Sequence, residues 1–112
     1  MIDLERIEQM AARLPGAQMS TSYGTPAVKA GKKLILRLHQ KEDAIVMMLD
    51  TVQAQEALIE SDPMTFYITD HYQGYAAVLI RPTIAEEVFF QIMEAAWRRV
   101  ANKRDINHYD TQ

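Results

Sequence analysis

The densest group of residues able to do chemistry lies at positions 66–75, where an acid, a histidine and several tyrosines surround a turn-like segment. Asp70 beside His71 is the pairing that a general base uses, in which a carboxylate orients the imidazole toward a substrate. Neighbouring residues of a strand point to opposite faces, however, and no nucleophile lies at a matching spacing. The pattern therefore favours an aspartate that caps a turn and a histidine at the surface. The tyrosines of this group are Tyr67, Tyr72 and Tyr75.

A second group, rich in hydroxyls, precedes Lys29. It contains Tyr23 and Thr25, with Gly24 and Pro26 setting the turns. A phosphate-binding loop needs successive backbone N–H groups, usually ahead of a helix, whereas a strand is expected here and proline removes one donor. The group favours a structured turn over an anion site.

An enzyme or a small-ligand domain would need these two groups to meet in one pocket. The residues that would have to converge are Tyr23, Lys29, Asp70, His71 and Tyr72. This requires the turn at residues 22–25 to lie near His71. Because no assembled catalytic motif is visible, we predict a protein without enzymatic activity and name no catalytic residue.

Metal and cofactor chemistry has little support in the sequence. The three histidines, His39, His71 and His108, are scattered, and there is no cysteine. No pair of histidines has the spacing with which helices hold zinc, and paired thiolates are excluded. We therefore expect neither a metal nor a cofactor.

The charges are segregated along the chain, although the net charge is only -3. Between Glu8 and Glu42 there are six basic residues and no acidic one. Such a segment can create a local positive potential that an acidic partner would feel, or it can simply be the wet face of strands. A second group of cations, Arg98, Arg99, Lys103 and Arg104, follows Trp97 at the end of the last predicted helix, where it suits the helix dipole and could equally meet phosphates.

The elements that must position these residues follow from hydrophobic periodicity. Apolar residues at helical spacing predict helices over residues 3–14, 52–59 and 84–100. Alternating or continuous apolar residues predict strands over residues 27–30, 33–38, 44–49, 65–69 and 75–81. Asp50 is the expected cap of the second helix, and Thr83 with Glu86 has the spacing of a capping box for the third.

These elements predict one α+β domain over residues 1–104, with the order α-βββ-α-ββ-α, and a flexible C-terminal tail over residues 105–112. We expect a five-stranded antiparallel sheet with helices packed on one face. The opposite face should be exposed to solvent unless a partner covers it. No apolar run approaches the roughly 20 residues of a membrane span. Together with the lack of a leader-like start, this predicts a cytoplasmic protein that does not bind membranes.

Several short motifs spread over nearly the whole chain, from the first helix to about Arg104. They are Ser22-Tyr23-Gly24-Thr25-Pro26, Asp62-Pro63, Phe66-Tyr67, Thr69-Asp70-His71-Tyr72, Gly74-Tyr75, and Ala96-Trp97-Arg98 with Lys103-Arg104. Together they resemble the MmcQ/YjbR family, and the Thr-Asp-His-Tyr segment with its following Gly-Tyr is the most specific part. Ala76 and Asn102 depart from the pattern, at places where relatives often carry proline.

The resemblance implies a CyaY-like α+β fold with two β-hairpins described as a double wing, in a family often labelled as DNA-binding. In that arrangement the wings contact phosphates and grooves of double-stranded DNA. The residues so implied are Lys29, Lys32, Lys33 and Arg37 in the first hairpin, and Tyr67, His71, Tyr72 and Arg81 in the second.

Two functions from different classes therefore remain open. The first is a small DNA-binding domain, supported by the basic segment, the two hairpins and the resemblance. The second is a non-enzymatic protein-interaction or adaptor module, because the same order of elements resembles secretion-chaperone-like domains, and it includes self-association as a homodimer.

Overall fold

The computed structural model describes all 112 residues as helices and strands joined by short links. The helices are α1 (Leu4–Ala11), α2 (Val52–Ser61), α3 (Glu86–Val100) and α4 (Lys103–Asp110), with a short 3-10 helix, η1 (Asp70–Tyr72). The strands are β1 (Ala17–Ser22), β2 (Thr25–Ala30), β3 (Lys33–Leu38), β4 (Ile45–Met48), β5 (Phe66–Tyr67) and β6 (Ala77–Ile80). No helix is both long enough and apolar enough to cross a membrane.

The strands form one antiparallel sheet in the order β1-β2-β3-β4-β6-β5. The α+β class and the antiparallel sheet are confirmed, but the predicted count of five strands and the order α-βββ-α-ββ-α are wrong. The missing strand is β1, an edge strand whose residues are mostly exposed on both faces. Because neither face of β1 is consistently buried, its sequence has no apolar alternation that marks it as a strand.

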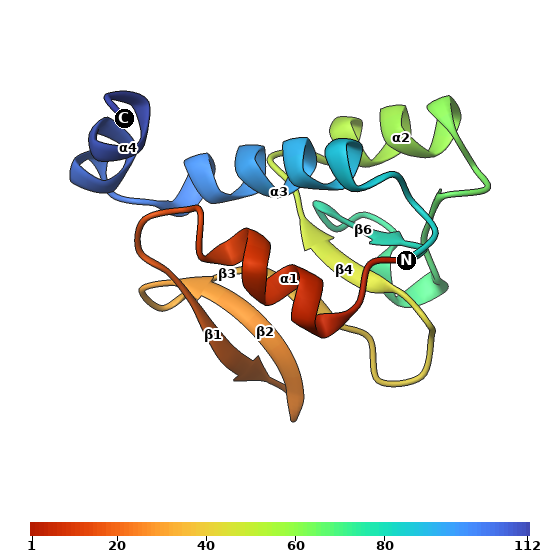
Figure 1. Cartoon of the computed structure of the whole chain (residues 1–112). Coiled ribbons are helices and arrows are strands. Elements are labelled where there is room, and N and C mark those ends of the chain that lie inside the picture. The colour runs from red at the N-terminus through yellow and green to blue at the C-terminus, as the bar shows by residue number, and fades with distance from the viewer.

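All four helices contribute apolar side chains to one large core on the same face of the sheet. Phe89, Met93 and Trp97 of α3 repeat every four residues and are fully buried. Figure 1 shows α1, α2 and α3 lying along the sheet, with α4 beyond the C-terminal end of α3 and the two chain termini far apart. The predicted helical layer on one face is what the structure shows.

The opposite face of the sheet divides into a covered part and an open part. Val46 and Leu79, on β4 and β6, form a smaller buried cluster with Tyr72 of η1. The chain's own segment after β5 therefore covers this side of β4 and β6, where a wet surface was expected. None of the four α-helices packs on the same face of β1, β2 and β3, which is the open face, although Ala27 in β2 is buried there.

A β-bulge on β3 sets which side chains reach the open face. Val28 pairs with Leu36 and Lys29 pairs with Leu34, so Ile35 is the extra residue. Ile35 and Leu36 are both buried in the helix-side core. After the bulge, the alternation places Arg37 on the open face.

Several predicted boundaries are corrected by the structure. Helix α1 ends at Ala11, and the cap of α2 is Thr51, whose Oγ1 accepts the Ala54 N–H at 3.0 Å, rather than Asp50. The capping box at Thr83 is wrong, because α3 begins without a side-chain cap and the Glu86 carboxylate pairs with Arg6 at 2.8 Å instead.

The last two predicted strands are shorter than expected, and the link between them is η1 rather than a simple turn. Most of the segment 105–112, predicted as a flexible tail, lies in α4. Asn102 caps this helix, and Ile106 and Tyr109 pack against the large core. Two apolar residues in a polar segment are a weak helical signal, although their spacing of three residues suits one helix face.

Candidate functional site

The open face centres on Arg37 in β3. Leu36 and Leu38 on either side of it pack in the helix-side core, so the Arg37 side chain points to the opposite face. Its guanidinium donates one hydrogen bond to the phenol oxygen of Tyr72 in η1, and a second to the backbone carbonyl of Leu38 at 3.3 Å. The same guanidinium lies 5.5 Å from the centre of the Tyr23 ring. Arg37 thus joins the two groups of residues that the sequence singled out.

The turn between β1 and β2 presents Tyr23 to solvent. Tyr23 has a positive φ of 52° and is 81% exposed. Its backbone carbonyl accepts the side-chain amide of Gln40 at 3.1 Å, and the buried Thr25 hydroxyl donates to the Ser22 carbonyl at 2.7 Å. Because the Thr25 hydroxyl closes the turn, this segment has the features of a structured turn and not those of an anion-binding loop.

The aromatic rings of η1 continue the surface away from Tyr23. The His71 ring lies 4.9 Å from the Tyr72 ring, edge to face, and 6.0 Å from the Tyr75 ring, nearly parallel to it. Tyr72 is buried, whereas His71 and Tyr75 are exposed, Tyr75 by 60%. Asp70 is the first residue of η1 and is exposed beside them.

Gln55 on α2 holds η1 in place and was not singled out in the sequence. It is only 3% exposed, and its amide nitrogen donates to the carbonyls of Tyr72, Tyr75 and Ala77 at 3.2, 2.8 and 2.7 Å. The sequence offers one sign that Gln55 is buried, which is its position three residues after Val52 and therefore on the same face of the helix. A glutamine within an apolar stripe is a sign that a buried amide has partners.

Most of the predicted cations lie either on the open face or around the β2–β3 turn. Val28 and Ala30 belong to the helix-side core, so Lys29 between them shares the open face with Arg37. Lys32 and Lys33 lie at the β2–β3 turn and line a pocket of about 290 Å³ together with Asn102 and the carboxylate-bearing Asp105, beside the start of α4 at Lys103 and Arg104.

Like Arg37, two more of the predicted cations are engaged by other groups of the chain. Arg98 forms an ion pair with Asp110 at 2.7 Å, which lowers the pKa of Asp110. Arg81 lies over the Tyr67 ring at 4.0 Å and donates to the Met64 carbonyl at 3.0 Å. The two ion pairs of the chain are Arg6–Glu86 and Arg98–Asp110, so no carboxylate lies within ion-pair distance of Lys29, Lys32, Lys33 or Arg37.

Tyr67 lies at the far edge of the sheet from Tyr23. Its hydroxyl donates to the Glu42 carboxylate at 3.0 Å. Burial and the neighbouring Glu42 raise the pKa of Tyr67, and Arg81 opposes this in part. Tyr67 is therefore held in its protonated form and linked to the β3–β4 loop.

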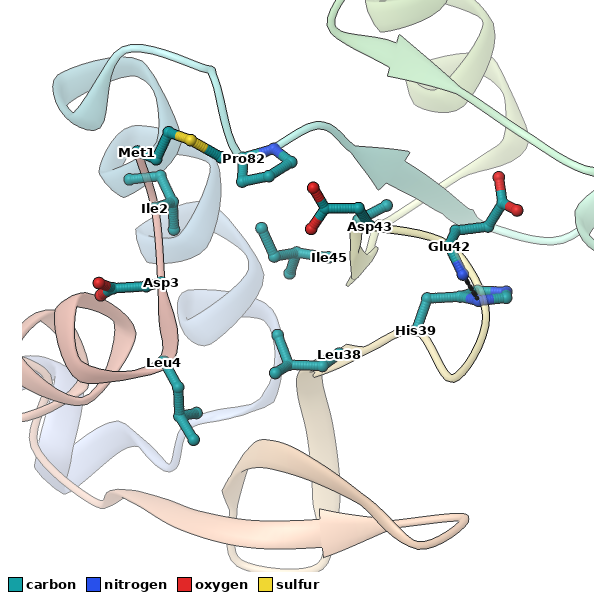
Figure 2. A pocket seen from close by; sticks show the side chains of 11 residues that line it. Met1, Ile2, Asp3, Leu4, Leu38, His39, Glu42, Asp43, Ile45 and Pro82 are labelled. Carbon is teal, nitrogen blue, oxygen red and sulfur yellow. Dashed lines mark hydrogen bonds between the residues drawn. The ribbon is translucent and has the colours of Figure 1, made fainter.

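A separate pocket of about 420 Å³ lies between the N-terminus and the β3–β4 loop (Figure 2). Most of its polar groups already have partners: Asp3 accepts the Arg6 N–H at 2.8 Å, and the Nδ1 of His39 accepts the Glu42 N–H at 2.9 Å. Nowhere in the chain do three His, Asp or Glu side chains group closely enough to hold a metal ion. The residues that line this pocket are Met1, Ile2, Asp3, Leu4, Leu38, His39, Glu42, Asp43, Ala44, Ile45 and Pro82.

The structure thus brings Tyr23, His71 and Tyr72 to one surface, with Lys29 on the same face of the sheet. None of the four lines the pocket beside the N-terminus or the pocket at the β2–β3 turn, and the His71 ring contacts the rings of Tyr72 and Tyr75 rather than a carboxylate. The arrangement offers cations and aromatic faces to a partner, but no paired nucleophile and base.

No family model, curated protein or solved structure matches this chain. The resemblance to the MmcQ/YjbR family therefore stays a prediction, and the function is proposed from the geometry of the open face.

Proposed function

We propose that the protein binds nucleic acid, with double-stranded DNA as the starting expectation, through the β2–β3 hairpin and the open face of the sheet. The observation that carries this proposal is that Lys29, Lys32, Lys33 and Arg37 have no carboxylate partner. Cations that form no ion pair within the chain keep a charge that phosphates can neutralise, although the Arg37 guanidinium is also hydrogen-bonded to Tyr72 and Leu38. The net charge of -3 does not oppose this, because the acids lie outside the segment between Glu8 and Glu42.

The geometry assigns different weights to the predicted contacts. Lys32 and Lys33 lie at the tip of the β2–β3 hairpin, beside Lys103 and Arg104 at the start of α4. Arg98 contributes little, since Asp110 already neutralises it. The second wing consists of η1 and its aromatic side chains, because β5 has only two residues.

The direct test is fluorescence anisotropy of a labelled mixed-sequence duplex at about 50 mM and about 200 mM salt. We expect binding that weakens steeply with salt, and Lys32→Gln and Lys33→Gln each to reduce the slope of log K against log salt by about 0.9 for each lost phosphate contact. Arg99→Gln is the matched control, since it removes the same charge from an exposed position on α3. Absence of binding to any nucleic acid at low salt would overturn the proposal.

A second candidate function, a protein-interaction module, is favoured by an apolar groove of about 440 Å³ between α2 and α3. Ala54, Leu58 and Ile92 are among the residues that line it. If this groove joins two copies of the chain, sedimentation at micromolar concentration will show a dimer that Ala57→Glu dissociates. A chain that stays monomeric under these conditions would remove self-association as its use.

A further inference from the structure

We infer that the open face binds single-stranded nucleic acid, with unpaired bases stacked on Tyr23 and Tyr75 and the phosphates along Lys29 and Arg37. This inference rests on the proposed function and narrows it to one class of nucleic acid.

The first step concerns the conformation of Tyr23. Ser22 pairs with Thr25, so Tyr23 and Gly24 form a two-residue hairpin turn, and both have positive φ, 52° and 75°. Turns of this kind favour Asn or Gly at the first position, because a bulky side chain is strained there. A tyrosine that is strained and 81% exposed gains little from packing within the chain. Its ring is free to contact a molecule outside the chain.

The second step concerns the rings around it. Tyr23, Arg37, Tyr72, His71 and Tyr75 form an unbroken series of contacts that runs from the open face onto the segment covering β4 and β6. The Tyr23 and Tyr75 rings at its ends are exposed, whereas Tyr72 in its middle is buried. One exposed ring lies in the β1–β2 turn and the other in the segment after η1, whose Tyr75 carbonyl is held by Gln55. Such rings provide stacking surfaces for bases, and every base has a π-face that can use them.

The third step distinguishes single strands from duplexes. In a duplex the base faces are already stacked on one another, so exposed tyrosine rings gain little from it. In a single strand the bases can turn toward the rings while the phosphates follow the cations. Lys29 and Arg37 share the face of the sheet opposite the four α-helices, and neither forms an ion pair with a carboxylate.

The test compares labelled dT12, rU12 and a 12-base-pair duplex in anisotropy titrations at the same salt concentration. We expect dT12 or rU12 to bind at least about tenfold more tightly than the duplex, since stacking adds to the phosphate contacts. The two single-stranded probes also show whether the 2′-hydroxyl matters.

The matched variants are Tyr23→Ala, Tyr23→Phe and Tyr23→Asn. Tyr23→Ala should weaken single-strand binding by about tenfold, and Tyr23→Phe should keep it, because only the ring is needed. Tyr23→Asn should weaken binding while raising the unfolding midpoint, since asparagine relieves the strain of the turn. Because affinity should fall while the unfolding midpoint rises, this variant distinguishes a loss of binding from a loss of folding. Met64→Ala, which truncates another exposed apolar side chain, is the control for a general surface effect.

The outcomes separate the two proposals. Binding of the duplex as tightly as the single strands, or single-strand binding that Tyr23→Ala leaves unchanged, would overturn this inference and leave nucleic-acid binding in place. Absence of binding to all three probes would overturn both. Tight single-strand binding that depends on the Tyr23 ring supports both.

Discussion

Arg37 on β3 donates a hydrogen bond to the phenol oxygen of Tyr72 on η1, which ties the centre of the sheet to the segment that covers its second face. The two residues are 35 positions apart in the chain. The bond also fixes the guanidinium beside Tyr23. The hydrogen bond between Arg37 and the Tyr72 hydroxyl therefore connects the open face to η1, and both residues belong to elements packed in the fold.

A double-mutant cycle with Arg37→Gln and Tyr72→Phe should measure this link. Tyr72→Phe keeps the buried ring and removes only the acceptor, so we expect each single variant to lose stability and the pair to show a coupling of about 1 kcal/mol. The measurement is urea unfolding of the four proteins. Strictly additive losses would show that the bond contributes nothing to the folded state.

Gln55 should be among the polar residues most important for stability. Gln55→Leu keeps the volume but leaves the Tyr72, Tyr75 and Ala77 carbonyls without their donor, which should cost about 2–3 kcal/mol. Hydrogen exchange should also accelerate at β6, because the adjoining segment loses its anchor. Gln53→Leu is the control, since Gln53 is exposed on the same helix. Equal stability of the two variants would contradict the anchoring role.

Sequence patterns predicted the elements that bury one face and expose the other. The four-residue repeat of Phe89, Met93 and Trp97 specifies α3, because a single helix face carries the whole signal. The edge strand β1 was not predicted, because its residues are mostly exposed and an exposed strand does not require alternating apolar side chains. Helix α4 escaped because it buries no residue completely.

Most residues of the candidate site were singled out in the sequence, but the central role of Arg37 was not predicted. Tyr23, Tyr72 and His71 were singled out by residue type, whereas the role of Arg37 as their link depends on the extra residue at Ile35. A bulge shifts every later side chain to the other face, and local sequence gives little sign of it. The anchoring by Gln55 likewise depends on how α2 packs, which only the tertiary structure specifies.

Helix α4 should be stabilised chiefly by Tyr109. Its ring lies 5.1 Å from the Trp97 ring, edge to face, and its hydroxyl donates to the Glu94 carboxylate. Tyr109→Ala should cost about 2 kcal/mol, less than a fully buried aromatic residue would. Because Trp97 is the only tryptophan and is fully buried, its fluorescence should shift to longer wavelength as α4 detaches.

Asn107→Ala is the control for this prediction, since Asn107 is exposed on the same helix. It should leave the emission of Trp97 and the helical circular dichroism unchanged. If Tyr109→Ala also leaves both signals unchanged, α4 is held by contacts other than this ring.

Alkaline pH should destabilise the protein through two tyrosines. Burial and Glu42 raise the pKa of Tyr67 above its ordinary value of 10.0, and the hydrogen bond to Glu94, followed by burial, raises the pKa of Tyr109. The folded state therefore keeps two protons that the unfolded state releases above about pH 10, so stability falls as the pH rises through that range. Below that range the contribution is fully present.

The measurement is the urea midpoint from about pH 8 to about pH 11.5 for the natural protein and for a Tyr67→Phe/Tyr109→Phe variant. The variant should start less stable, because it lacks two hydrogen bonds, but lose less of its stability at alkaline pH. Parallel curves for the two proteins would show that these hydroxyls do not govern the alkaline limb.

Asp70 gives a prediction of opposite sign for binding. It is an exposed carboxylate next to His71 and lies at the end of the open face where Tyr75 is found. A carboxylate there repels phosphates, so Asp70→Asn should tighten binding of dT12 severalfold at low salt, and the gain should shrink as salt screens the charge. Glu87→Gln, an exposed charge change in the first turn of α3, is the matched control and should have a smaller effect. If the two variants behave alike, the charge acts through the overall field of the protein, and the strand does not pass near η1.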